Sequence, residues 1–291
     1  MSKKILITGS NGQIGHSLNL FFEDKDFDIK YTSLNVIKNH ILPLDLTLNE
    51  NVESLFDNYK PDFIINTAGY TNVDLSEINR NIASKVNVNI VKNLLKYMPK
   101  TTKIIHISTD YIFDGLNAPY SEQDLPNPIN FYGQSKLEAE NLIRSSRKKY
   151  IIIRTGNLYS QFINLNSNRL SWIINSLSNN KKIFAADDMI SKPTNTCTIP
   201  NLIFSLLPLS DNLIINYTGQ NAISIFDFAM LIAKTFNFDS SLINKCKADD
   251  LNFKAKRPIN VSLSTDFASD LINCNIYETE YCLNIIKDKI K

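Results

Sequence analysis

Short apolar runs and helical stripes alternate along the first 160 residues. The apolar runs predict buried strands at residues 3–7, 28–34, 41–46, 62–66, 103–108 and 150–154. Between them, apolar residues recur at helical spacing over residues 14–22, 49–59, 76–97 and 132–145. This order predicts βαβ units, and hence an α/β fold with a doubly wound parallel sheet covered by helices on both faces.

The rhythm changes after about residue 160. Helices are predicted at residues 167–178, 196–207 and 224–236, and short strands at 182–184 and 213–217. We therefore expect two domains, a nucleotide-binding domain over residues 1–160 and a smaller C-terminal α/β substrate lobe over 161–291. As an alternative, the last part of the chain could pack back onto the sheet of the first domain. The single Trp172 is expected in the core of the lobe, with stacking on a nucleotide base as the alternative.

The composition excludes several classes of protein. Of the 291 residues, 43% are hydrophobic, and a net charge of +2 gives no basic surface for nucleic acid or a membrane. No apolar run approaches the roughly 18–20 residues that span a bilayer, and the chain lacks the apolar stretch of a secretory signal near its start. The cytoplasm is the expected compartment. The four cysteines form no Cys-x-x-Cys pair, so we expect no metal site and no disulfide framework.

Three of only eight glycines directly follow the first predicted strand. Gly9 permits a tight turn, Gly12 lets a pyrophosphate approach the backbone, and Gly15 lets the next helix pack closely on the strand. The N–H groups of the first helical turn would then face the phosphates. The alternative is a glycine turn that binds nothing. We predict the dinucleotide-binding loop of a Rossmann-type fold, formed by Gly9, Asn11, Gly12, Gln13, Ile14 and Gly15.

The strand ends favour NADPH as the cofactor, with NADH as the alternative. An acidic residue that would bind a ribose 2′-hydroxyl is missing at the end of the second strand, where Ser33 could accept a 2′-phosphate. Asp45 and Leu46 lie at the end of the third predicted strand and are expected beside the adenine. The cofactor should cross the sheet at Thr67, Ala68 and Gly69.

A Tyr and a Lys lie four residues apart on the helix predicted at 132–145. Positions i and i+4 share a helix face, so the Lys136 ammonium is expected to lower the pKa of Tyr132 and also to hold the nicotinamide ribose. Tyr132 could then protonate a carbonyl oxygen as hydride reaches the carbon. Thr109 follows a buried strand and could bind the same oxygen. Tyr111 stands where a dehydratase needs Glu, which favours carbonyl reduction over elimination of water.

These motifs resemble a known family. The matching segments are residues 12–15, 70–77 (Tyr-Thr-Asn-Val-Asp-Leu-Ser-Glu), 108–115 (Ser-Thr-Asp-Tyr-Ile-Phe-Asp-Gly), the loop and helix start over 120–136, and Arg257-Pro258. They are similar to the dTDP-4-dehydrorhamnose reductases, within the extended short-chain dehydrogenase/reductases. The resemblance is strong over residues 3–160 and thin afterwards.

The resemblance implies NAD(P)H-dependent reduction of the 4-keto group of a deoxysugar nucleotide, with dTDP-4-dehydrorhamnose as the first candidate, and also a homodimer. It implies Thr109, Tyr132 and Lys136 as the catalytic set. It implies a substrate site that includes Tyr70, Asp110, Tyr111 and Asn157, although Asp110 could instead cap a loop. Asn157 stands where the family often has Trp, and residues 188–194 (Asp-Met-Ile-Ser-Lys-Pro-Thr) differ from the corresponding family segment. Both departures fall where the substrate should lie, which leaves the nucleotide base and the sugar stereochemistry open.

Two other functions remain open at this stage. One is a non-catalytic NADP-binding subunit, similar to the β subunit of methionine adenosyltransferase, which resembles the same reductases. An intact set of Thr109, Tyr132 and Lys136 argues against it. The other is a sugar-nucleotide epimerase, which would keep its cofactor tightly bound and consume no NADPH.

Overall fold

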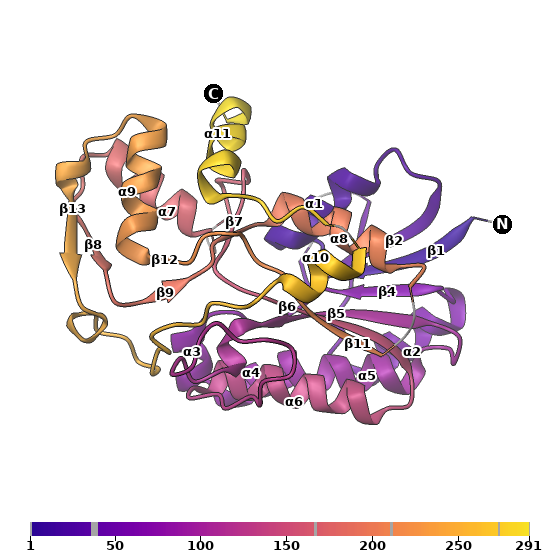
Figure 1. Cartoon of the computed structure of the whole chain (residues 1–291). Coiled ribbons are helices and arrows are strands. Elements are labelled where there is room, and N and C mark those ends of the chain that lie inside the picture. The colour runs from indigo at the N-terminus through magenta and orange to yellow at the C-terminus, as the bar shows by residue number, and fades with distance from the viewer. Residues whose placement is uncertain (1, 36–39, 166–167, 210–211, 273, 291) are drawn as a thin grey trace.

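A seven-stranded parallel sheet forms the centre of the molecule (Figure 1). The computed structural model describes residues 2–35, 40–165, 168–209, 212–272 and 274–290. The strand order is β11-β6-β5-β4-β1-β2-β3. The strands are β1 (Lys3–Thr8), β2 (Phe27–Ser33), β3 (Ile41–Pro43), β4 (Phe63–Asn66), β5 (Lys103–Thr109), β6 (Lys149–Thr155) and β11 (Leu213–Asn216). The order reverses beside β1, which confirms the predicted doubly wound, Rossmann-type fold.

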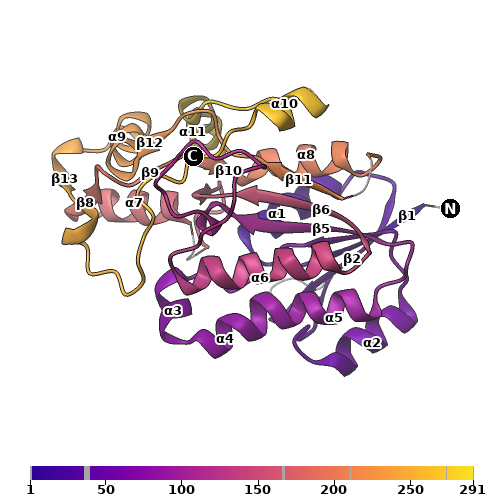
Figure 2. The same cartoon turned by 60° about the horizontal axis from the view of Figure 1, so that its bottom comes forward.

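Successive residues of the central strands enter two different hydrophobic cores, as the strand period of two requires. Ile5, Ile7 and Ile105 face one core, while Leu6 and Ile104 face the other. The first core is covered by α1 (Gln13–Phe22), α8 (Ile199–Leu206) and α10 (Asp266–Ile272), and the second by α2 (Asn49–Asn58), α5 (Ile90–Tyr97) and α6 (Phe131–Ser145). Figure 2 shows α5 and α6 side by side on their face of the sheet.

The prediction of one continuous helix over residues 76–97 is wrong. The segment forms α3 (Val73–Ile78), α4 (Arg80–Ser84), a π-helical turn η1 (Lys85–Asn89) and α5. The backbone leaves the helical region at Asn79, where φ is −116° and ψ is 59°. In the π-helical turn, the buried Asn87 binds both backbone groups of Tyr70 and the hydroxyl of Ser135. Side-chain periodicity carries no signal for such a backbone change.

The chain returns to the sheet in the middle of its C-terminal part. After the lobe begins, α8 packs on the first core and β11 pairs in parallel with β6, from Leu213 opposite Ile151 to Asn216 opposite Arg154. The later helix α10 adds Ala268 to the same core. Part of the segment 161–291, which was predicted as the substrate lobe, therefore completes the nucleotide-binding sheet.

The remaining C-terminal residues form a lobe beside the carboxyl ends of the strands (Figure 1). Its helices are α7 (Arg169–Ser178), α9 (Ile225–Phe236) and α11 (Thr279–Lys289), and its paired strands are β7 (Leu158–Tyr159) with β10 (Thr194–Asn195), β8 (Ile183–Ala186) with β13 (Ile243–Cys246), and β9 (Ile190–Ser191) with β12 (Ile223–Ser224). The predicted start of the first lobe helix, Ser167, lies outside the described residues. Trp172 is 47% exposed, so its prediction as a core residue is wrong.

Candidate functional site

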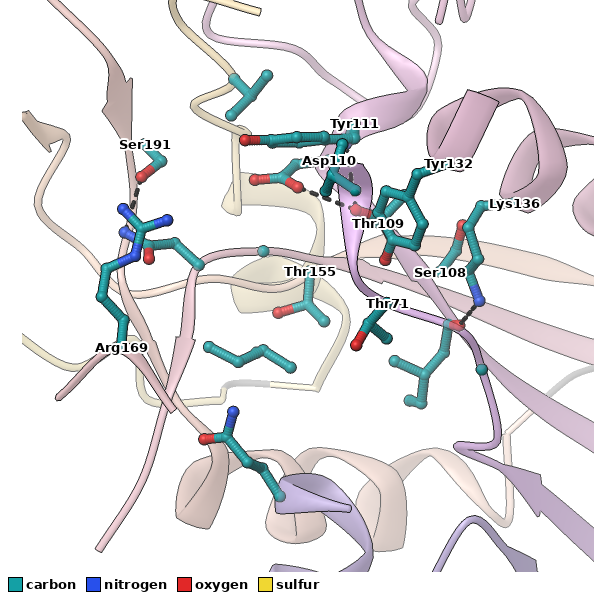
Figure 3. A pocket seen from close by; sticks show the side chains of 18 of the residues that line it. Thr71, Ser108, Thr109, Asp110, Tyr111, Tyr132, Lys136, Thr155, Arg169 and Ser191 are labelled. Atoms are coloured by element: carbon teal, nitrogen blue, oxygen red, sulfur yellow. Dashed lines mark hydrogen bonds between the residues drawn. The ribbon is translucent and has the colours of Figure 1, made fainter. Parts of the chain in front are cut away.

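A cavity of about 450 Å³ lies where the carboxyl ends of the strands meet the C-terminal lobe (Figure 3). Ligands of doubly wound folds bind at this edge of the sheet. Twelve of the residues predicted from the sequence line it: Gly12, Gln13, Ile14, Thr67, Ala68, Gly69, Thr109, Asp110, Tyr111, Tyr132, Lys136 and Asn157. The glycine loop, the ends of β4 and β5, and helix α6 thus face one space.

The glycine loop forms a backbone cradle that side chains would fill. Gly9 has a φ of +69°, and a Cβ atom at Gly15 would lie 2.5 Å from the Gly9 carbonyl oxygen. A Cβ atom at Gly12 would meet only that oxygen, at 3.3 Å, so its outer face is open to a ligand. Gly12 caps α1 without a side-chain hydrogen bond, so the first N–H groups of α1 can face an anion. These features fit a dinucleotide pyrophosphate.

Several predicted residues lie outside the lining of this cavity. Asp45 accepts hydrogen bonds from the backbone and side chain of Thr47, and Leu46 is buried in the second core.

Other predicted residues also lie outside this lining. Ser33 is the last residue of β2, and Asn87 binds the backbone of Tyr70. Gly9, Asn11 and Gly15 belong to the glycine loop but do not line the cavity themselves. The adenine side of the predicted cofactor site therefore stays a prediction.

Burial governs the proton affinity of Tyr132, which lies in the first turn of α6. The Asn130 side chain caps this helix by accepting the N–H of Gly133. Burial raises the pKa of Tyr132, and a hydrogen bond with Thr109 only partly opposes this rise. The sequence-based expectation of a pKa lowered by Lys136 is not met. The reason is that burial dominates the pKa of Tyr132, and Asp110 and Tyr111 raise it further.

Lys136 lies one turn further along α6 and is 5% exposed. Its Nζ atom donates a hydrogen bond to the Ile107 carbonyl oxygen at 2.6 Å and lies 3.3 Å from His106 Nε2. Burial lowers the pKa of Lys136 to about 8. Burial and the Lys136 charge also hold the pKa of His106 well below its usual value, so His106 is neutral. Its other ring nitrogen lies 3.0 Å from Asn66 Nδ2.

Asp110 follows Thr109 at the end of β5 and is 3% exposed. Burial raises the pKa of its carboxyl group to about 7. Its Oδ1 atom accepts a hydrogen bond from Thr109 Oγ1 at 3.1 Å. Gly156 makes room for this carboxyl, because a Cβ atom there would lie 1.8 Å from Asp110 Oδ2. A proton-bearing group therefore lies directly beside Thr109.

Part of the lobe side of the cavity was missed from the sequence. It is lined by Arg169, Met189, Ile190, Ser191 and Ile225, and Thr155 and Gly156 lie between it and the sheet. Asn157 has a φ of +44° and donates a hydrogen bond from Nδ2 to Ser191 Oγ at 2.9 Å. Arg169 and Ile225 stand at helix starts that carry no motif, and neither was predicted. Met189, Ile190 and Ser191 belong to the segment 188–194, which was expected near the substrate.

No helix among the described residues is both long and apolar enough to cross a membrane. Within the same part of the chain, His, Cys, Asp and Glu form no group of three or more that could hold a metal ion.

Fold and site together define the class: a Rossmann-like α/β protein whose glycine loop and Thr–Tyr–Lys set face one cavity. The model of the family described as RmlD substrate binding domain matches residues 3–287, and the chain belongs to this family. This confirms the resemblance seen in the motifs.

Named relatives agree with the family. The chain is 32% identical to a dTDP-4-dehydrorhamnose reductase of Aggregatibacter actinomycetemcomitans, with 89% of this chain and 90% of the relative covered. It is 25% identical to the methionine adenosyltransferase 2 subunit beta of Danio rerio, over 99% of this chain and 90% of that one. The crystal structure of dTDP-4-dehydrorhamnose reductase from Bacillus anthracis in complex with NADP superposes with a TM-score of 0.89 at 26% identity, covering 99% of this chain and 100% of that chain.

Proposed function

We propose that this protein is an NADPH-dependent oxidoreductase that reduces the 4-keto group of a deoxysugar nucleotide, with dTDP-4-dehydrorhamnose as the first candidate substrate. The observation that carries the proposal is the convergence of Thr109, Tyr132 and Lys136 with the glycine loop in one cavity. The NADP complex of the Bacillus anthracis reductase supports the cofactor. The reductase relative supports the substrate class.

In the proposed reaction, each residue of the set has a separate role. NADPH, when bound along the glycine loop, supplies the hydride. Tyr132 donates its phenolic proton to the carbonyl oxygen, and its raised pKa keeps it protonated beforehand. The Thr109 hydroxyl orients the same oxygen. Lys136 holds a positive charge on the same face of α6, where it can bind a ribose hydroxyl.

A non-catalytic function is the second candidate, because a methionine adenosyltransferase subunit is among the relatives. Such a subunit needs the cofactor site but not an acid–base set. Thr109, Tyr132 and Lys136 all line the cavity here, and this favours an enzyme. An epimerase would use the same groups but would regenerate its own cofactor.

The test is oxidation of NADPH, followed by absorbance, with a panel of 4-keto sugar nucleotides that begins with dTDP-4-dehydrorhamnose. We expect stoichiometric oxidation with at least one member. Tyr132→Phe should lower turnover by about a hundredfold to ten-thousandfold, because the proton donor is lost, and should leave NADPH affinity nearly unchanged. The control is Tyr281→Phe, at a position that is 53% exposed on α11.

Each alternative gives a different result. NADPH binding without oxidation of any panel member would indicate a non-catalytic subunit. Tightly bound NAD that co-purifies, with sugar epimerisation and no NADPH consumption, would indicate an epimerase. Undiminished turnover in Tyr132→Phe would refute the proposed role of Tyr132.

A further inference from the structure

The lobe side of the cavity carries a cation with no obvious role in hydride transfer. Among the described residues that line the cavity, only Lys136 and Arg169 are cationic. The Lys136 ammonium is already engaged by the Ile107 carbonyl and by His106. The Arg169 guanidinium makes no hydrogen bond and no ion pair with any residue that the structure describes. Figure 3 shows it on the opposite side of the cavity from Tyr132 and Lys136.

The position of Arg169 is fixed by its own helix. Arg169 is the first residue of α7, and the buried Asn168 caps this helix by accepting the Leu170 N–H. The Asn168 amide also donates a hydrogen bond to the Ser160 carbonyl oxygen at 2.8 Å. On the inner face of α7, Leu170 and Ile173 are fully buried in the lobe core. The guanidinium is therefore carried on a rigid element, as a binding residue requires.

The surroundings leave this positive charge largely uncompensated. Burial lowers the pKa of Arg169 most strongly, while Tyr111 and, less strongly, Asp110 favour its charged form. The pKa of Tyr111 is raised and that of Asp110 is raised to about 7, so the phenol is neutral and the carboxyl is partly protonated near neutral pH. The Arg257 guanidinium opposes the charge, and Arg257 is itself paired with Asp74 at 2.9 Å. A half-buried cation without a partner is costly, and a bound anion would offset that cost.

The lining around Arg169 would strengthen an interaction with an anion. Met189, Ile190 and Ile225 are apolar and line the same part of the cavity. A low local dielectric strengthens charge-assisted hydrogen bonds. A guanidinium binds the two oxygens of a phosphate or a carboxylate in a planar, bidentate geometry, which a lysine cannot reproduce.

We propose that Arg169 is the specificity-determining residue of the lobe side of the cavity, and that it binds an oxyanion of the substrate. Two groups have this chemistry: a phosphate of the nucleotide diphosphate, and a carboxylate on the sugar. The inference rests on the proposed function for the identity of the ligand as a sugar nucleotide. It does not depend on hydride transfer.

The test measures binding by isothermal titration calorimetry in the protein saturated with NADP⁺. The probes are dTDP, thymidine, UDP-glucose and UDP-glucuronate, and the variants are Arg169→Gln and Arg169→Lys. Loss of the charge-assisted hydrogen bonds should lower the affinity for the anionic probe by about tenfold to a hundredfold in Arg169→Gln. Arg169→Lys should recover part of that affinity. Lys182→Gln is the control, because it removes one charge from an exposed position in the same lobe.

The probes separate the two sources of the anion. Weaker dTDP binding with unchanged thymidine binding assigns Arg169 to the diphosphate. Unchanged dTDP binding with a lost preference for UDP-glucuronate over UDP-glucose assigns it to a sugar carboxylate. Equal binding of all four probes by the wild type and Arg169→Gln would overturn the proposal, as would a wild type that binds none of them. Nucleotide binding that depends on Arg169, without any NADPH oxidation, would support the anion site and refute the proposed reaction.

Discussion

Burial sets the protonation of the three ionisable groups that surround Thr109. It raises the pKa of Tyr132, lowers that of Lys136 to about 8 and raises that of Asp110 to about 7. Each shift favours the neutral form, as desolvation requires. Sequence motifs identified these residues because their spacing is local. They could not identify Arg169, because its place opposite Tyr132 depends on how the lobe packs against the sheet.

The lowered pKa of Lys136 predicts a pH limit on cofactor binding. Below about pH 8 the side chain is an ammonium that can bind a ribose hydroxyl, and it loses this charge as the pH rises through that value. The dissociation constant for NADPH, measured by fluorescence titration, should therefore increase above about pH 8. Lys136→Met should bind NADPH weakly and lose this dependence. An unchanged alkaline limit in Lys136→Met would assign it to another group.

The raised pKa of Asp110 predicts a pH-dependent stability. A carboxyl whose folded pKa of about 7 exceeds its ordinary 3.8 contributes stability that is fully present below about pH 4 and is lost as the pH rises through 7. Because the Asp110→Asn side chain cannot ionise, this variant does not lose that stability as the pH rises. Relative to the wild type, it should gain up to about 4 kcal/mol in free energy of unfolding between pH 4 and pH 9, at about 1.4 kcal/mol per pKa unit. Urea unfolding at both pH values measures the gain, and an equal difference at both would contradict it.

At the scale of elements, hydrophobic periodicity predicted the buried strands but not the local changes in backbone geometry. The strands β1, β4, β5 and β6 follow from apolar runs whose alternate residues enter two cores. The break at Asn79 and the π-helical turn around Asn87 leave the apolar spacing intact, so the segment read as one helix. The pairing of β11 with β6 is a long-range contact, and four residues carry too little pattern to specify a partner.

Gly12, which caps α1, and Gly15, in the first turn of α1, should differ in what their substitution costs. A Cβ atom at Gly15 would lie 2.5 Å from a backbone oxygen, so Gly15→Ala should force β1 and α1 apart and lower stability by about 1–3 kcal/mol. At Gly12 the corresponding distance is 3.3 Å, so Gly12→Ala should keep most of the stability. It should nevertheless weaken NADPH binding, since its methyl group would lie in the cradle. Thermal unfolding and NADPH titration of both variants check this, and equal stability losses would refute the distinction.

At the scale of the whole molecule, the C-terminal half completes the sheet as well as forming the lobe. Ile199, Leu202 and Ile203 of α8 cover the first core, and β11 pairs with the edge of β6. A truncated chain of residues 1–160 should therefore expose an apolar sheet face and an open strand edge. We expect this fragment to aggregate and to show no cooperative unfolding by circular dichroism, whereas the full chain should unfold in a cooperative transition. A soluble fragment that unfolds cooperatively and binds NADPH would show that the return is dispensable.

The return of β11 to β6 also has a consequence during synthesis on the ribosome. About sixty residues separate the end of β6 from the end of β11, and translation at about 5–20 residues per second needs roughly 3–12 s to add them. A sheet that forms during that interval would have one unpaired edge at β6 and one face not covered by α8. Molecular chaperones that bind extended apolar segments could bind this uncovered sheet. Slow codons between residues 160 and 216 would lengthen the time during which they can bind.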